Sequence, residues 1–360
     1  MKIIVLTGGL SSERDVSLSS GAGICKALRT NGHQAFLLDV FMGISYDSSR
    51  LEEIFSLPDA GLSIANTIQT DEPDIATIKA LRNDQSDCFF GENVIELCRM
   101  ADITFLGLHG GFGEDGRLQA AFDVLGIQYT GPSSIGNVLA MDKDITKKMF
   151  QMAGIPTPQG ARLHKNMQNT SLQQHGLSLP VVVKPCTGGS SIGVYIAHTQ
   201  EEYQDALEKS FALDVEVIVE SYIKGREFSC GILGEQVLPI IEIIPKSGFF
   251  DYAHKYQSGF SQEICPADLP AHLTKKIQET TRKAFDALKL DVYSRADCLV
   301  DENENIYFLE MNTLPGMTSS SLFPQEAAAA GIEYTDLCER IIEESLKARP
   351  PLCKKKGEPV

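Results

Sequence analysis

The first third of the chain alternates short apolar runs with helix-like segments, and this alternation restricts the fold more than any other feature. The runs KIIVLT, QAFLLDV and DITFLGLHG have the length of strands, and the segments SLSSGAGICKALRTNGH and ENVIELCRMA separate them. Strands that alternate with helices in this way form parallel sheets with crossover helices. We therefore expect an α/β fold that begins with a parallel sheet.

The length and the composition limit the class of protein. A chain of 360 residues is too long for one core, so we expect two or three domains. The hydrophobic content of 43% and charged content of 22% are typical of a soluble globular protein. The formal net charge of −16 argues against nucleic acid or an anionic membrane as a partner, because no general positive field attracts phosphates.

Neither secretion nor membrane insertion is expected. The start, MKIIVLTGG, has the pattern of a strand that enters a turn, not of a signal peptide. No apolar run approaches the length that crosses a bilayer. The nine cysteines are scattered without a C-x-x-C pair, which favours free thiols in a reducing cytoplasm over a zinc site.

Two further units are expected after Pro132. The first contains helix MDKDITKKMFQMAG, strand LPVVVKP, helix EEYQDALEKSFA and strand VEVIVESYI. The last begins near Lys224, and its expected elements are strands FSCGILG and QVLPIIEII, a long loop over 245–266, helix LTKKIQETTRKAFDALK, strands RADCLVD and NIYFLEMN, and the C-terminal helix TDLCERIIEESLKA. The region 41–85 is expected to be a polar, irregular insertion, and no role is assigned to it.

Three oxygen-bearing side chains are expected to converge on the last hairpin. Glu310 and Asn312 are two residues apart and share one face of a strand. Asp297 lies on the preceding strand, and antiparallel pairing across the short turn at 301–305 brings it to Glu310. Hard oxygen ligands suit Mg²⁺ or Mn²⁺, with water or phosphate completing the shell. The alternative is a structural acid paired with Arg295.

A phosphate-binding loop is expected after strand VVVKP. There is no Walker motif, because GFGEDGR is followed by leucine and lacks the required Lys-Ser/Thr. In VVVKPCTGGSSIGV a strand delivers Lys184, and the glycines and serines of 188–193 can bring N–H and hydroxyl donors to phosphate oxygens. The alternative for this loop is a surface linker.

A hinge is expected where strand VEVIVESYI ends. Glu220 closes the apolar run, and backbone groups of Ser221, Tyr222 and Ile223 could read an adenine edge. Glu227 could hold a ribose, although an acid at such a position is more often a solvated surface residue.

Eleven segments together resemble one family. They occur in the order GGLSSERDVSLSSG, LHGGFGEDGRLQ, YTGPSS, AMDKDITKKMF, AGIPTP, VVVKPCTGGSSIGV, VESYIKGREFS, YAHKYQSG, CPADL, RADCLV and LEMNTLPGMTSSSLFP. From residue 3 to about residue 345, the chain resembles the D-alanine–D-alanine ligases of the ATP-grasp superfamily. The resemblance implies a three-domain ATP-grasp fold with a Rossmann-like N-terminal domain (1–131), a central domain (132–223), a C-terminal domain (224–346) and a tail (347–360).

The resemblance also implies a reaction and its requirements. ATP phosphorylates the carboxylate of one D-alanine, and the amine of a second D-alanine attacks the acyl phosphate, which gives a peptidoglycan precursor. The implied cofactors are ATP and two Mg²⁺ or Mn²⁺ ions, and the implied protein is a cytoplasmic homodimer that associates through its first domain.

Residue roles follow from the same resemblance. The lysines of the ATP site would neutralise phosphate oxygens, and Arg295 with the N–H of Gly316 would stabilise the acyl phosphate and the tetrahedral intermediate. Glu13 would accept the ammonium of the first D-alanine. The implied catalytic residues are Glu13, Ser190, Tyr256, Arg295 and Gly316; those for ATP are Lys143, Lys184, Glu220, Ser221, Tyr222, Ile223, Glu227 and Lys255; those for D-alanine are His109, Ser321 and Leu322; and those for the metal are Asp297, Glu310 and Asn312.

Two other functions stay open at this point. One is a ligase of the same fold that joins D-alanine to D-serine or D-lactate; a hydrogen bond between Tyr256 and Ser190 is expected to favour an amine over the alcohol of D-lactate. The other is a non-catalytic nucleotide-binding module, which would be expected to lose at least one of Lys184, Arg295, Asp297 and Glu310, whereas all four are present.

Overall fold

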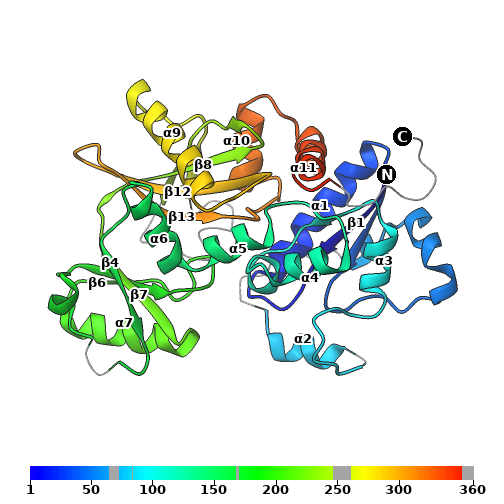
Figure 1. Ribbon diagram of the computed structural model, residues 1–360, viewed down its shortest axis with the longest axis horizontal. Helices are drawn as coiled ribbons and strands as arrows, with labels where there is room; N and C mark the ends of the chain where they lie inside the picture. Colours follow the sequence, from blue (N-terminus) through cyan, green and yellow to red (C-terminus); the bar gives the residue numbers. More distant parts are fainter. Residues whose placement is uncertain (65–72, 83, 168–169, 246–260, 351–360) are drawn as a thin grey trace.

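The computed structural model describes residues 1–64, 73–82, 84–167, 170–245 and 261–350 (Figure 1). The strands in these ranges form three sheets of three, six and four strands. The three-stranded sheet lies at one end of the molecule, and the other two lie toward the opposite end, one above the other in the view of Figure 1.

The N-terminal sheet is parallel, as the alternation of apolar runs and helices predicts. It is formed by β1 (Lys2–Thr7), β2 (Gln34–Asp39) and β3 (Ile103–Leu106) in the order β2-β1-β3. Every residue of β3 is buried, and in β1 and β2 every residue except the first is buried. The helical segments of this part are α1 (Arg14–Thr30), α2 (Ile75–Leu81), α3 (Val94–Met100), α4 (Arg117–Leu125) and the short 3-10 helix Gly111–Gly113.

The expectation of an irregular, polar insertion at 41–85 is wrong for much of that region. It contains α2 and the 3-10 helices η1 (Ser48–Ser56) and η2 (Leu62–Ile64). Leu51, Ile54 and Phe55 of η1 are buried in the core of the N-terminal sheet. Their spacing places them on one side of a single short helix, a signal that the surrounding polar residues obscure.

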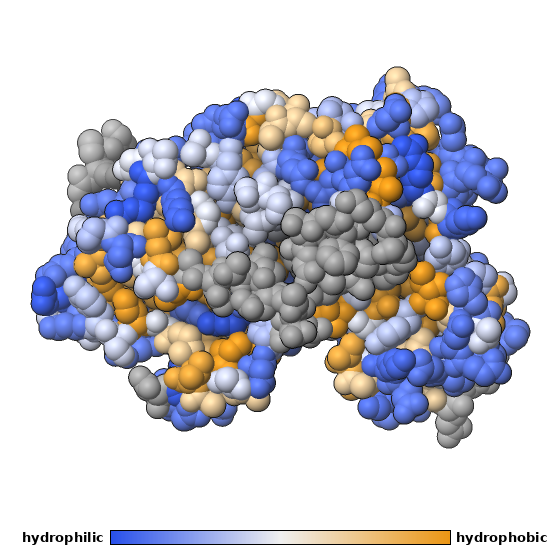
Figure 2. Space-filling view, turned by 180° about the vertical axis from the view of Figure 1, so that it is seen from behind, coloured by the Kyte–Doolittle hydropathy of each residue, from blue (hydrophilic) through white to orange (hydrophobic). Residues whose placement is uncertain are grey.

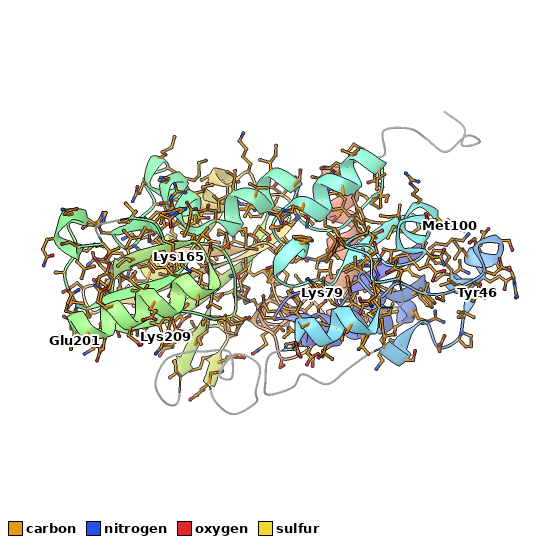
Figure 3. The ribbon with its side chains drawn as sticks, turned by 90° about the horizontal axis from the view of Figure 1, so that it is seen from below. Tyr46, Lys79, Met100, Lys165, Glu201 and Lys209 are labelled. Atoms are coloured by element: carbon orange, nitrogen blue, oxygen red, sulfur yellow. The ribbon has the colours of Figure 1, made fainter. Side chains whose placement is uncertain are left out.

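The four-stranded sheet is antiparallel and has its own core. Its strands are β4 (Gly160–His164), β5 (Val181–Pro185), β6 (Tyr195–Ala197) and β7 (Glu216–Ser221), in the order β4-β7-β5-β6. Helix α7 (Gln200–Leu213) covers it and buries Tyr203 against Val183 and Val219. Exposed Glu201 and Lys209 project from α7 on the side of the molecule seen in Figure 3. A short 3-10 helix, Leu172–His175, precedes β5.

The six-stranded sheet carries the predicted hairpin. Its strands are β8 (Gly225–Leu233), β9 (Gln236–Val237), β10 (Ile241–Pro245), β11 (Ser261–Ile264), β12 (Tyr293–Asp301) and β13 (Ile306–Asn312). The order is β11-β10-β8-β12-β13, with β9 paired to β8. The turn between β12 and β13 lies at 302–305, where the sequence predicts it.

Two strand predictions in this part need correction. The segment QVLPIIEII is two strands, because Pro239 lies between β9 and β10 and has no N–H for a ladder. The expected loop over 245–266 contains β11, which pairs antiparallel with β10.

Five helices flank the six-stranded sheet and the chain end. Helices α5 and α6 pack with β13, and Phe150 of α6 shares a core with Phe308 of β13 and Ile277 of α9. The helices are α5 (Ser134–Met141), α6 (Lys143–Met152), α9 (Ala271–Ala287), α10 (Leu322–Ala329) and α11 (Tyr334–Ala348).

The first and the last parts of the chain share one core. Leu6 and Phe105 of the N-terminal sheet belong to the same buried cluster as Leu337, Ile341 and Ile342 of α11. Helix α11 lies beside α1 (Figure 1). The N-terminal sheet and the end of the chain therefore form one packed body.

The face of the molecule in Figure 2 is mostly hydrophilic, and its hydrophobic residues form separate groups among polar ones. Within the described ranges, no helix combines the length and the apolar character that a bilayer span requires.

Candidate active site

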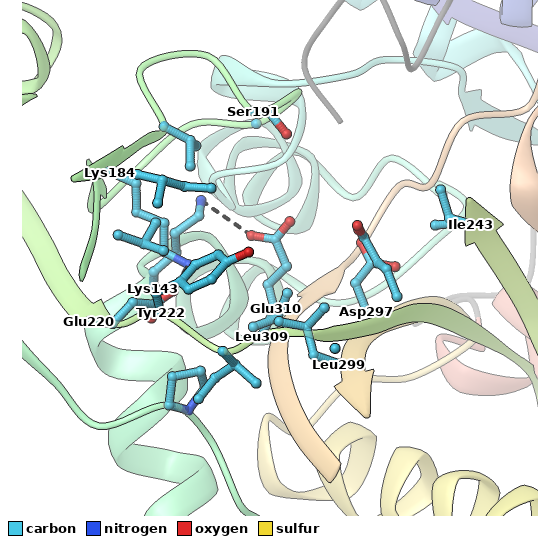
Figure 4. Close-up of a pocket in the computed structure, with 18 of the residues that line it drawn as sticks. Lys143, Lys184, Ser191, Glu220, Tyr222, Ile243, Asp297, Leu299, Leu309 and Glu310 are labelled. Atoms are coloured by element: carbon cyan, nitrogen blue, oxygen red, sulfur yellow. Dashed lines mark hydrogen bonds and ion pairs between the residues drawn. The ribbon is translucent and has the colours of Figure 1, made fainter. Parts of the chain in front are cut away.

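A cavity of about 590 Å³ lies between the four-stranded and six-stranded sheets (Figure 4). This volume is in the range of small-molecule sites. Val182, Ile196, Leu299 and Leu309 give the cavity apolar walls. Nine of the residues predicted from the sequence line it, namely Lys143, Lys184, Glu220, Ser221, Tyr222, Ile223, Glu227, Asp297 and Glu310.

Two lysines form the cationic side of this cavity. Lys184 lies on β5, and its Nζ is 2.6 Å from Oε1 of Glu220 at the end of β7. Lys143 is the first residue of α6; its Nζ donates to the carbonyl of Gly188 at 2.6 Å and lies 3.5 Å from Oε2 of Glu310. The glycine-rich loop is thus tied to α6, and both ammonium groups stand where phosphate oxygens could bind.

The acidic side of the cavity is the predicted hairpin. Asp297 is directly opposite Glu310 in the ladder, and Arg295 is opposite Asn312. Arg295 donates to both carboxylate oxygens of Asp297, at 3.0 and 2.9 Å. Nδ2 of Asn312 also donates to Asp297, at 2.8 Å. Asp297 therefore forms the ion pair with Arg295 that the structural alternative expects. It also lines the cavity, so the ion pair does not exclude a role for Asp297 in binding a metal.

The hairpin residues fit a magnesium ion that arrives with phosphate. Asp297 and Glu310 offer carboxylate oxygens to the cavity, and Asn312 lies beside them with an amide. In the described part of the chain, no three His, Cys, Asp or Glu side chains converge as a metal site. Two carboxylates and an amide leave most of an octahedral shell to other oxygens, as expected where a nucleotide supplies some of the ligands.

A second group of predicted residues surrounds Glu13, just before α1. The hydroxyl of Ser190 donates to Oε1 of Glu13 across 177 residues of chain, so the glycine-rich loop touches the N-terminal sheet's unit. A Cβ added to Gly110 would lie 2.7 Å from Oε2 of Glu13, and one added to Gly189 would lie 3.0 Å from it. Glycine at both positions leaves room for the Glu13 carboxylate between the two loops without displacing it.

His109 lies in the same region in a fixed orientation. Its Nδ1 is 3.0 Å from the carbonyl of Leu314, and its Nε2 is 2.9 Å from Oγ of Ser20. Because a carbonyl only accepts, Nδ1 carries the proton and Nε2 accepts from the serine. Burial lowers the pKa of His109, which keeps the ring neutral. The histidine therefore joins α1 to the segment that follows β13.

The residues predicted for the second substrate meet at the start of α10. Ser321 is the N-cap of this helix, and Leu322 is its first residue. A Cβ added to Gly316 would lie 2.8 Å from Oγ of Ser321. Backbone N–H groups at a helix N-terminus can bind a carboxylate. Two further predicted residues, Lys255 and Tyr256, lie outside the described ranges.

Sequence reasoning missed two charged residues near these groups, the partly buried Glu114 and the buried Lys147. Glu114 stands in GFGEDGR, a segment that fails as a Walker motif and belongs to the family resemblance, and its Oε2 accepts from the N–H of Gly110 at 3.1 Å. Lys147 follows Lys143 by one helical turn, and its side chain is only 4% exposed. Helical spacing places Lys147 on the same face of α6 as Lys143, but the burial of that face depends on packing. The contact of Glu114 with Gly110 had no signal in the sequence.

The pKa of Glu114 predicts a dependence of stability on pH. Burial raises this pKa to about 8, and the nearby Glu13 carboxylate acts in the same direction. Between pH 4.5 and 8 the folded state keeps a proton that the unfolded state has released, so the free energy of unfolding should fall as pH rises through this window. Glu114→Gln keeps an acceptor for Gly110 and removes the titration.

We expect the wild-type protein to lose stability relative to Glu114→Gln between pH 5 and pH 8.5, by roughly a few kcal/mol. Urea unfolding of both proteins across this range measures the difference. Parallel stability curves would show that Glu114 is ionised throughout.

Comparisons with known proteins agree with this arrangement. The family model described as "D-ala D-ala ligase N-terminus" matches residues 2–132, and that described as "D-ala D-ala ligase C-terminus" matches 149–343. A D-alanine–D-alanine ligase of Pediococcus pentosaceus is 41% identical over 346 residues, covering 95% of this chain and 97% of the relative.

Two solved structures show the same likeness. The D-alanine–D-alanine ligase of Bacillus anthracis complexed with ATP has a TM-score of 0.74 at 33% identity, covering 97% of this chain and 98% of the other. A D-Ala:D-Ser ligase from Enterococcus faecalis has a TM-score of 0.71 at 28% identity, covering 95% and 98%. The ATP-grasp fold expected from the sequence is therefore confirmed. Two family models together match most of the chain, and a relative that covers 95% of it is 41% identical, so the chain belongs to the D-alanine–D-alanine ligase family.

Proposed function

We propose that this protein uses ATP to join two molecules of D-alanine into D-alanyl-D-alanine, through a D-alanyl phosphate. Family membership supports the reaction, which supplies a precursor of peptidoglycan. The observation that carries the proposal is the cavity in which two lysines face two acids across the space between two sheets. Such an arrangement suits a bound nucleotide, and the ATP complex of the similar Bacillus anthracis enzyme agrees with it.

The first step needs charge neutralisation on the transferring phosphoryl group. Lys143 and Lys184 supply positive charge from the walls of the cavity, and the loop that carries Gly188 is held to Lys143 by a hydrogen bond. Asp297, Glu310 and Asn312 would hold two Mg²⁺ ions, which neutralise phosphate charge when bound. Backbone groups of 221–223 would hold the adenine and Glu227 the ribose, since all of them line the same cavity.

The second step needs a bound acyl phosphate and a free amine. Glu13, held by Ser190, would accept the ammonium of the first D-alanine, with His109 beside it. Arg295 and the N–H of Gly316 would stabilise negative charge on the acyl phosphate and on the tetrahedral intermediate. The N-terminus of α10 at Ser321 and Leu322 would bind the carboxylate of the second D-alanine, whose amine attacks while phosphate leaves.

Two parts of this proposal rest on residues outside the described ranges. Lys255 would contact a phosphate, and Tyr256 would bond to Ser190 and favour an amine over an alcohol as acceptor. D-Serine is the alternative second substrate, because a D-Ala:D-Ser ligase is among the similar structures. The higher identity to D-alanine–D-alanine ligases favours D-alanine.

We also propose the division into domains at 1–131, 132–223 and 224–346, with a tail at 347–360, and a homodimer in the cytoplasm. The three sheets support the division, although α5 and α6 pack with the six-stranded sheet. A cytoplasmic location agrees with the use of ATP. Sedimentation of the full chain tests the dimer.

One experiment tests the function. Phosphate release from ATP is measured with D-alanine, L-alanine, D-serine and D-lactate, and the products are identified by mass. We expect release only with D-alanine as the first substrate and D-alanyl-D-alanine as the main product. If D-alanine does not stimulate phosphate release, the proposal is refuted. If the main product instead joins D-alanine to D-serine or D-lactate, that compound is the second substrate.

A further inference from the structure

A buried cluster of three charges lies behind one wall of the cavity. Glu220 accepts from Lys184 at 2.6 Å through Oε1 and from Lys147 at 2.8 Å through Oε2. The side chains of Lys147 and Glu220 are each 4% exposed, and that of Lys184 is 9% exposed. Lys184 and Glu220 line the cavity, whereas Lys147 does not.

Each carboxylate oxygen of Glu220 thus accepts a hydrogen bond from a lysine ammonium group. Burial alone would raise the pKa of Glu220, but the ammonium groups of Lys147 and Lys184 outweigh it and lower the pKa to about 2. The carboxylate is therefore charged at neutral pH. Burial lowers the pKa of Lys147, and the Glu220 carboxylate acts in the opposite direction. With both lysines protonated, two ammonium groups and one carboxylate leave one net positive charge in the cluster.

Without Lys147, Glu220 and Lys184 would form a pair with no net charge. The ammonium of Lys184 would then be compensated by its own partner, and a phosphate would have to compete with a buried carboxylate for it. With Lys147 present, the carboxylate is already neutralised from the side that faces away from the cavity.

The position of Lys147 is fixed from several sides. Its Nζ also donates to Oγ1 of Thr157 at 2.8 Å. A Cβ added to Gly160 of β4 would lie 3.4 Å from Cε of Lys147 and 3.1 Å from Cβ of Glu220. Since Lys143 and Lys147 are one turn apart on α6, the same helix places one lysine in the cavity and the other behind Glu220.

We propose that Lys147 is a positioning residue of the ATP site, which neutralises and holds Glu220 so that Lys184 presents a full positive charge to the nucleotide. This inference rests on the proposed ATP site and goes beyond it by naming a group that never touches the nucleotide. It explains why a nucleotide-binding wall contains a buried carboxylate next to its own lysine.

A double-mutant cycle tests the inference. The dissociation constant of ATP with Mg²⁺ is measured by calorimetry, without D-alanine, for the wild-type chain, Lys147→Met, Glu220→Gln and the double variant. We expect Lys147→Met to weaken ATP binding by about tenfold or more in the wild-type background. In the Glu220→Gln background, where no carboxylate needs neutralising, we expect the same change to weaken it by less than about threefold.

A matched control is the next residue of the same helix. The side chain of Lys148 is 60% exposed and pairs with Asp144, so Lys148→Met should leave ATP binding unchanged. In steady-state assays Lys147→Met should raise the KM of ATP and leave that of D-alanine unchanged, whereas a general loss of structure would raise both. If Lys147→Met does not fold, the ATP dissociation constant is measured instead for Lys147→Gln in both backgrounds. This variant keeps a hydrogen-bond donor to Glu220 and removes the positive charge.

The outcomes separate the two proposals. An equal loss of affinity in both backgrounds, or no loss in either, would overturn the role of Lys147 while ATP binding by the wild-type chain still stands. A wild-type chain that does not bind ATP would instead refute the proposed function.

Discussion

Replacement of Arg295 by lysine is expected to reduce kcat by roughly 10²–10³-fold. Arg295 holds Asp297 with two parallel hydrogen bonds, at 3.0 and 2.9 Å. Lysine keeps the positive charge but lacks the planar guanidinium group with its several N–H donors. It therefore cannot hold the Asp297 carboxylate in a fixed geometry and at the same time stabilise the acyl phosphate. ATP affinity should fall less than kcat, because lysine keeps a positive charge beside Asp297 and other residues line the cavity itself.

The control for this variant is Arg349→Lys. The side chain of Arg349 is 16% exposed and pairs with Asp291 at 3.2 Å, and that of Arg295 is 12% exposed. The two variants should lose comparable stability in thermal unfolding, but only Arg295→Lys should lose turnover at saturating D-alanine and ATP. If Arg295→Lys keeps more than a tenth of the wild-type kcat, Arg295 serves only to support Asp297.

Glu310→Gln should leave the fold intact and reduce turnover at low Mg²⁺ by roughly 10²–10³-fold. Glutamine has nearly the same shape as glutamate, and Glu310 is part of a hairpin whose backbone ladder does not depend on its charge. Loss of one carboxylate weakens the proposed metal site, which has no third acid among the described residues. A higher Mg²⁺ concentration should therefore restore part of the activity.

The hairpin provides its own control for this prediction. Glu302 lies in the exposed turn between β12 and β13, so Glu302→Gln removes the same charge away from the cavity. Turnover of each variant is measured from 0.1 to about 50 times the Mg²⁺ concentration that half-activates the wild-type protein. Full activity of Glu310→Gln at low Mg²⁺ would favour a purely structural role for this acid.

Features that depend on residues close together in the chain are the ones that the sequence predicts. The pairing of Asp297 with Glu310 could be predicted, because only a short turn separates their strands and antiparallel register then follows. The glycine-rich loop after Lys184 was visible for the same reason. In these cases neighbouring residues contain most of the information.

Features that depend on distant packing could not be predicted in this way. Lys147 and Lys148 are adjacent and chemically identical, yet their side chains are 4% and 60% exposed, because only the packing of α6 decides which one faces Glu220. Strand β4 was missed because it is an edge strand with a single fully buried residue, Leu163. Its alternation of apolar Ala161 and Leu163 with polar Arg162 and His164 is only four residues long, which is at the lower limit of a strand signal.

The core shared by the two ends of the chain has a consequence for synthesis on the ribosome. Ile341 and Ile342 complete the packing around the first sheet. The match to the N-terminal family model, however, ends at residue 132. At about 5–20 residues per second, the 210 residues between these positions take roughly 10–40 s to translate. During this time the apolar surface that α1 will present to α11 stays uncovered. The nascent first unit must therefore remain soluble, or be shielded by a chaperone, until the last helix emerges.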